Sequence, residues 1–181
     1  TPTHYAAHIL KALDMASAKG LRLPIVYNTS GWERAEIITL LDGIVDIYLP
    51  DFKYWDGDLA AKYSAGADSY PALARAAILE MHRQVGVARP DSKGLIKRGV
   101  MIRHLVMPNN TAGSEDVMAW IAANLPQDTF VNIMGQYRPE HRVPGKDRYQ
   151  DIDRRILRQE MDAAYSSART AGLWRFDERW A

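Results

Sequence analysis

Polar side chains follow each of four short apolar segments of this chain, and their chemistry suits the binding of a ligand. They are Asn28, Thr29, Ser30 and Gly31 after the first segment, Asp51, Lys53 and Asp56 after the second, Arg103, His104, Asn109 and Asn110 on and after the third, and Asn132, Gln136, Tyr137 and Arg138 at the end of the fourth. An aspartate accepts hydrogen bonds from an ammonium or a hydroxyl, and lysine and arginine bind carboxylates. The set predicts a polar binding site if the fold brings the four segment ends together.

Each of these groups also has a purely structural interpretation. The turn 28–31 is typical of a helix cap followed by a turn glycine. Asp51 and Lys53 lie two residues apart, so they share one side of an extended strand, where they form either a plain ion pair or a clamp on a ligand. Arg103 lies inside an apolar strand and needs a partner or water, because an unpaired buried charge is costly; a salt bridge that supports only the fold meets that need. His104 points to the opposite face, which is typical of a hydrogen-bonded core histidine.

A repeat of helix, turn and strand must position these residues. The spacing of apolar residues predicts helices over 4–19, 32–41, 58–62, 70–85, 114–125 and 153–171, and strands over 23–27, 44–49, 99–107 and 129–134. Ser114 is the expected N-cap of its helix, and Gly172 follows the last helix. Strands that alternate with helices predict an α/β fold in a single domain, 1–181, with a parallel sheet of about four βα units. The carboxyl ends of parallel strands meet at one edge of the sheet, so we expect the polar groups to converge there.

Composition excludes several classes of protein. The chain carries 23 Lys and Arg against 22 Asp and Glu, so its charge gives no drive toward nucleic acid or an anionic membrane. No apolar run approaches the roughly 18 residues of a membrane span, and an apolar fraction of 47% can support a core. The absence of cysteine excludes disulfides and thiolate ligands and agrees with a reducing, cytoplasmic location. The five histidines show no metal-ligand motif, so no metal site is predicted on this chain.

Four segments of the chain together resemble the radical S-adenosylmethionine superfamily, and specifically proteins similar to pyruvate formate-lyase activating enzyme. They are RLPIVYNTSGW (22–32), VDIYLPDFKYWD (45–56), GVMIRHLVMPN (99–109) and FVNIMGQYRPEHRVPG (130–145). The resemblance covers nearly the whole chain. Its order and spacing agree with strands three to six of that family's partial (β/α)6 TIM-like barrel.

The resemblance implies cofactors that this chain cannot hold alone. Members of the family bind a 4Fe-4S iron–sulfur cluster through a CxxxCxxC loop after the first strand and carry a GGE motif after the second, and neither motif occurs here. The chain is therefore expected to be the C-terminal part of such a protein, inactive by itself and without bound cofactor. The implied activity of the intact parent is that of an oxidoreductase. The cluster donates an electron that cleaves S-adenosylmethionine, and the resulting 5′-deoxyadenosyl radical abstracts hydrogen, with a glycyl-radical enzyme or another protein as the implied substrate.

The resemblance also assigns cofactor-binding roles to matching positions, although it assigns no catalytic residue to this chain. The turn Asn28–Ser30 matches the segment that contacts the ribose or methionine part of the cofactor. The DFK sequence Asp51–Lys53 matches the family's DLK, which lines the S-adenosylmethionine pocket, and Arg103 matches a barrel-facing arginine beside it. Tyr137 and Arg138 fall at the last strand end, where relatives contact adenine or ribose with different residues; Arg138 stands where activating enzymes can have histidine.

Two alternatives from other classes stay open at the level of sequence. One is a Schiff-base aldolase in which Lys53 is the nucleophile, although no second lysine or phosphate-binding loop accompanies it. The other is a non-enzymatic module that associates through an open sheet edge, for example as a homo-oligomer, since a partial barrel leaves strand edges and an apolar concave face unpaired.

Overall fold

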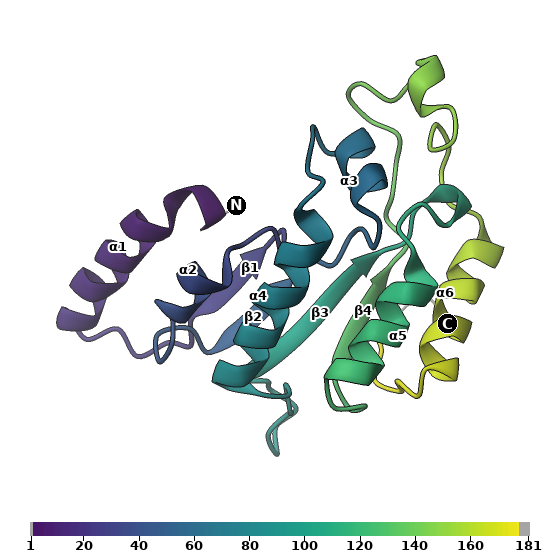
Figure 1. Ribbon diagram of the computed structural model, residues 1–181. Helices are drawn as coiled ribbons and strands as arrows, with labels where there is room; N and C mark the ends of the chain where they lie inside the picture. Colours follow the sequence, from purple (N-terminus) through teal and green to yellow (C-terminus); the bar gives the residue numbers. More distant parts are fainter. Residues whose placement is uncertain (1, 178–181) are drawn as a thin grey trace.

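A four-stranded parallel sheet forms the centre of the protein. The computed structural model describes residues 2–177. The strands are β1 (Val26–Thr29), β2 (Ile47–Pro50), β3 (Gly99–Leu105) and β4 (Phe130–Met134), and they lie in the order β1-β2-β3-β4 (Figure 1). All three neighbouring pairs are parallel, so the strands end at the same edge of the sheet. The expected α/β class and the parallel sheet of four strands are confirmed.

Helices connect the strands and cover one face of the sheet (Figure 1). The described α-helices are α1 (Ala6–Ala18), α2 (Ala35–Thr39), α3 (Gly57–Tyr63), α4 (Tyr70–Val85), α5 (Ser114–Asn124) and α6 (Arg158–Thr170), and short 3-10 turns occupy Pro2–Tyr5, Pro108–Asn110 and Asp147–Tyr149. Helix α4 packs beside α2, and α5 beside α6. Among residues 2–177, no helix is both long and apolar enough to cross a lipid bilayer.

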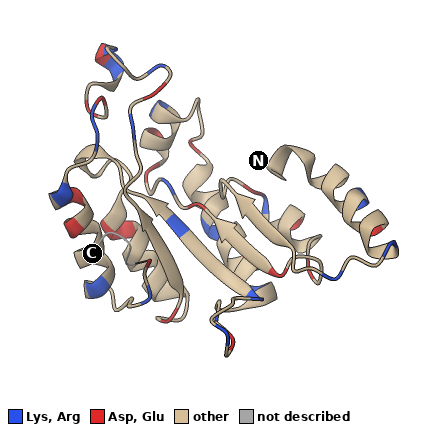
Figure 2. Ribbon diagram, turned by 180° about the vertical axis from the view of Figure 1, so that it is seen from behind, with Lys and Arg blue, Asp and Glu red and all other residues tan. Residues whose placement is uncertain are grey.

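The two faces of the sheet differ in burial. In β3 the side chains of Val100, Ile102 and His104 are buried, whereas those of Met101 and Arg103 on the other face are only partly covered. This alternation is expected of a strand with one face in the core, because successive side chains point to opposite sides. Figure 2 views the sheet from the second side, and no described helix lies over it there. We call this second side the open face.

The predicted start of the last helix and the predicted N-cap of α5 are wrong. The last helix begins at Arg158 rather than at 153, because Arg154 instead forms an ion pair with Glu160, and the Glu160 carboxylate accepts a hydrogen bond from the Leu157 N–H. Ser114 is the first residue of α5 and not its N-cap. Gly113 holds the cap position with a φ of +69°, where a Cβ would lie 2.7 Å from Trp55 Cβ.

The first two strands begin later than the apolar runs suggest. β1 starts at Val26 and β2 at Ile47, because Leu23 and Ile44, which are exposed to solvent, precede the paired segments. The helix expected over 32–41 is limited to α2, since the chain first makes a turn in which the Glu33 carboxylate is buried.

Candidate functional site

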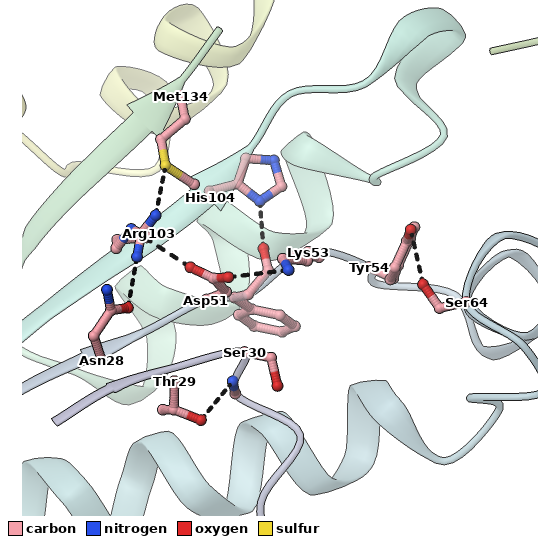
Figure 3. Close-up of polar contacts among 12 residues, drawn as sticks. Asn28, Thr29, Ser30, Asp51, Lys53, Tyr54, Ser64, Arg103, His104 and Met134 are labelled. Atoms are coloured by element: carbon pink, nitrogen blue, oxygen red, sulfur yellow. Dashed lines mark hydrogen bonds and ion pairs between the residues drawn. The ribbon is translucent and has the colours of Figure 1, made fainter. Parts of the chain in front are cut away.

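Side chains from three strands meet at the carboxyl edge of the sheet (Figure 3). The Arg103 guanidinium donates a hydrogen bond to Asn28 Oδ1 over 2.6 Å, and its Nε lies 3.5 Å from Asp51 Oδ1. The register explains the meeting, because Asp51 pairs with Arg103 just beyond the end of β2, and β1 lies beside β2. The structure thus brings together residues that lie up to 75 positions apart in the sequence.

Asp51 is the centre of this group. Its side chain is 11% exposed, and Oδ2 lies 3.1 Å from the Lys53 ammonium. Asp51 Oδ1 is buried and accepts no hydrogen bond from any described residue, although the Arg103 guanidinium is close. A buried carboxylate oxygen without a donor is costly, so the nearby Arg103 guanidinium is the group that offsets the charge of this atom.

The turn after β1 is held by its own hydrogen bonds. The Thr29 hydroxyl donates to the Glu33 carboxylate over 2.6 Å, and the Gly31 N–H lies 3.3 Å from Thr29 Oγ1. Ser30 takes part through its carbonyl oxygen, which accepts from the Tyr70 hydroxyl. The structure therefore gives Thr29 and Ser30 the structural role of forming the turn, while Asn28 is the residue of this segment that faces Arg103.

Gly31 and Tyr70 bring this turn against the end of β2. Gly31 has a φ of +79°, and a Cβ on it would lie 2.0 Å from the Asp51 carbonyl oxygen. The Tyr70 hydroxyl accepts from the Lys53 N–H over 2.9 Å and lies 2.9 Å from the Asp51 carbonyl oxygen and 3.0 Å from that of Ser30. Burial is the largest cause of a raised pKa for Tyr70, so the phenol keeps its proton and donates to these carbonyls.

His104 fixes the same segment from the core side. Its Nδ1 lies 2.7 Å from the Phe52 carbonyl oxygen, which can only accept, so Nδ1 carries the proton and donates. Nε2 then accepts from the Ser114 hydroxyl over 2.8 Å. Burial lowers the pKa of His104 to about 4, so the ring is neutral at physiological pH. His104 is the hydrogen-bonded core histidine expected from its place in the strand, and it positions the segment that carries Asp51 and Lys53.

A cavity of about 660 Å³ lies on the open face beside Arg103. Its lining consists of Asn28, Leu49, Met101, Arg103, Asn132, Met134, Gly135, Gln136 and Asp177. We call it the sheet cavity. Its volume is in the range typical of small-molecule sites. The apolar residues of its wall, such as Met101 and Met134, are not among the site residues predicted from the sequence. Alternation along β3 puts Met101 on the same face as Arg103, and β4 pairs with β3, so both residues could have been found from the strand pattern.

Tyr137 and Arg138 do not lie in the sheet cavity. The Tyr137 hydroxyl donates to the Ile152 carbonyl over 3.0 Å, and burial is the largest cause that raises its pKa to about 12. Both residues line a second cavity, which shares only Gly135 and Gln136 with the first. Strand β4 ends at Met134, and the chain then leaves the sheet. Residues three and four positions beyond the strand are therefore not held at the carboxyl edge of the sheet, where Arg103 lies.

The residues described between positions 2 and 177 contain no group of three histidine, aspartate or glutamate side chains placed to hold a metal ion. The sequence also has no cysteine. The site itself carries one acidic side chain, Asp51, beside two basic ones, Lys53 and Arg103.

The fold places the chain among α/β proteins with a parallel sheet, in which ligands commonly bind at the carboxyl ends of the strands. No family model matches this chain. The chain is similar to a protein of Methanocaldococcus jannaschii described as "Uncharacterized protein MJ0674", with 30% identity over 167 residues. The alignment covers 92% of this chain and 44% of the relative, so the chain spans less than half of that protein's length.

Proposed function

We propose that this chain is the C-terminal part of a radical S-adenosylmethionine enzyme resembling pyruvate formate-lyase activating enzyme, and that its sheet belongs to a partial (β/α)6 barrel. The observation that carries the proposal is the convergence of Asn28, Asp51, Lys53 and Arg103 at the carboxyl edge of one parallel sheet. The open face supports it, because the interior of a barrel formed by further βα units is a face without helices (Figure 2). A relative more than twice as long as the aligned segment also supports it.

The residues of the site fit S-adenosylmethionine. The Asp51 carboxylate has the chemistry to bind an ammonium or a ribose hydroxyl, and the Lys53 and Arg103 side chains suit a carboxylate. When bound, S-adenosylmethionine together with a reduced iron–sulfur cluster supplies the chemistry that abstracts hydrogen from a substrate. The cluster itself does not fit this chain, because no cysteine is present to ligate it, so its ligands belong to residues outside this sequence.

The chain's own contribution is to bind, orient and shield the cofactor. Asn28 holds the Arg103 guanidinium in place, while Met101 and Met134 contribute apolar surface to the sheet cavity. His104 and Tyr70 keep the Asp51–Lys53 segment in position by binding its backbone. A fixed polar environment of this kind is how proteins direct a cofactor whose own chemistry is difficult.

The decisive experiment uses the intact parent. We expect the sequence encoded ahead of Thr1 to contain CxxxCxxC followed by GGE. The anaerobically reduced parent is then expected to release 5′-deoxyadenosine from S-adenosylmethionine. Asp51→Asn and Arg103→Ala should each lower this release at least about tenfold, since each removes a charge-assisted contact. Arg142→Ala, which removes an exposed charge in the loop after β4, is the matched control. A parent without the two motifs, or variants as active as the control, would refute the proposal.

A second experiment tests where the cluster ligands lie. The isolated chain, incubated anaerobically with iron and sulfide, is expected to gain no iron–sulfur absorption band. A stable iron–sulfur chromophore on this polypeptide would contradict the assignment of the ligands to residues outside it.

A second candidate function, association through the open sheet, is favoured by one specific observation. β1 pairs with β2 on one side, and on its other side no described strand pairs with it. Val26 on this strand is 51% exposed, which is high for an aliphatic strand residue. Light scattering over rising protein concentration should then show self-association; a monomer at all concentrations would speak against it.

A further inference from the structure

We propose that the second cavity is a binding site for a small organic anion with an apolar body. We call it the helix cavity. It has a volume of about 640 Å³ and is lined by Gly135, Gln136, Tyr137, Arg138, Arg155, Ile156, Leu157, Arg158, Met161, Asp162 and Tyr165. The inference does not depend on the proposed function, because it concerns a different cavity with different chemistry.

Part of the lining of the helix cavity is apolar. Ile156, Leu157 and Met161 line it at the start of α6, together with the ring of Tyr165. Leu157 is 46% exposed, although a leucine of this kind is stabilised by burial. A ligand with an aliphatic or aromatic body would cover this surface.

The rim of the helix cavity is positively charged. It carries three arginines against one aspartate, and Asp162 lies 3.9 Å from Arg158. Arg138 and Arg155 form no ion pair with any described residue, whereas Arg154, next in the chain to Arg155, is paired with Glu160. Two unpaired guanidiniums beside apolar lining residues favour a carboxylate or another anion, because each guanidinium can bind such a group with two parallel hydrogen bonds.

The start of α6 adds to this preference. Leu157 and Arg158 line the helix cavity at the N-terminal end of a helix of 13 residues. The Glu160 carboxylate already accepts from the Leu157 N–H at this end, so the helix end contributes its dipole, which favours negative charge, rather than this N–H group. The guanidiniums and the helix end therefore select the same sign of charge.

The helix cavity and the sheet cavity meet at Gly135 and Gln136, which line both. Gly135 lines both cavities, and a Cβ on it would lie 3.0 Å from Met161 Sδ and 3.2 Å from Ile156 Cδ1. The absence of a side chain lets α6 close against the end of β4 at this point. Different methionines line the two cavities, so the occupancy of each cavity can be measured separately.

Methionine methyl groups provide the readout for a binding test. Met161 lines the helix cavity, while Met101 and Met134 line the sheet cavity. We would label the methionine methyl groups with carbon-13 and titrate the chain with 4-phenylbutyrate, using neutral 4-phenylbutanol as the control compound. We expect a saturable shift of the Met161 signal with the carboxylate, a much weaker response to the alcohol, and unmoved signals from Met101 and Met134.

Variants then test the role of charge. The double variant Arg138→Ala/Arg155→Ala should weaken 4-phenylbutyrate binding at least about tenfold, because it removes both unpaired guanidiniums. The single variant Arg142→Ala, an exposed arginine outside the lining, should leave binding unchanged. Before ligand is added, Met101 and Met134 signals at the same positions as in the parent chain show that each variant is folded. The inference is overturned by a Met161 signal that does not move, by equal binding of the alcohol, by shifts confined to Met101 and Met134, or by a double variant that binds as tightly as the parent chain.

Discussion

Replacing His104 with asparagine is expected to remove much of the loss of stability that this protein suffers in mild acid. The folded protein holds His104 neutral in the core, with a pKa of about 4 compared with 6.5 for an unperturbed histidine. The unfolded chain therefore binds a proton that the folded chain rejects. Stability is full above pH 6.5 and falls as the pH decreases toward about 4, the sign expected for a histidine whose pKa is depressed by folding.

The magnitude follows from the two pKa values. Linkage with those values gives a loss of ~2 kcal/mol in the free energy of unfolding between about pH 7 and about pH 4.5. The carboxylates with the most strongly lowered pKa values, such as Glu80 and Glu160, begin to cost stability only below about 4.5, their ordinary pKa. His82 also has a pKa lowered by burial, so it adds acid sensitivity that His104→Asn leaves in place.

Urea unfolding, followed by tryptophan fluorescence at a series of pH values, measures this effect. The quantity compared is the slope of the unfolding free energy against pH, so a constant cost of the substitution cancels. His141→Asn is the matched control, because His141 is exposed and its φ of +58° suits asparagine. Equal slopes for the His104 variant and the parent chain would refute the reasoning that His104 is buried and neutral.

Three further predictions concern the contacts that build the site. Gly31→Ala should destabilise the protein by more than ~2 kcal/mol, because the new Cβ would lie 2.0 Å from the Asp51 carbonyl oxygen. Gly20→Ala is the control: Gly20 also has a positive φ but lies in open space, so this variant should lose less stability in the same urea assay. Tyr70→Phe should cost about 1–3 kcal/mol because it leaves buried backbone groups without their partner, and a neutral result would contradict that hydrogen bonding. A double-mutant cycle of Arg103→Gln with Asp51→Asn should give a coupling of about 1 kcal/mol that weakens in high salt, and additive effects would show that the two charges do not interact.

Several features of the site could be predicted because they depend on local patterns. Apolar runs bounded by turn residues located the four strands, and the alternation of strands and helices required them to be parallel. Parallel strands end at one edge, which is why Asn28, Asp51, Lys53 and Arg103 could be expected to lie together. The opposite orientation of Arg103 and His104 followed from the two-residue period of a strand.

Other features depend on contacts between distant segments. The Ser114 hydroxyl binds His104 rather than capping its own helix, because β3 and α5 pack together in the core. The Tyr137 hydroxyl binds the Ile152 carbonyl, which removes Tyr137 and its neighbour Arg138 from the sheet cavity. Neither contact leaves a trace in the spacing of nearby residues.

The sequence by itself therefore determined the type of each element, the direction of the strands and which side chains follow each strand end, since these depend on neighbours along the chain. The tertiary structure decided which of those side chains share a cavity, and it revealed a second cavity beside α6. The physical reason is that strand register and helix packing are set by contacts between residues far apart in the sequence. Arg103 and Asn28 meet only after two crossovers have placed their strands in one sheet.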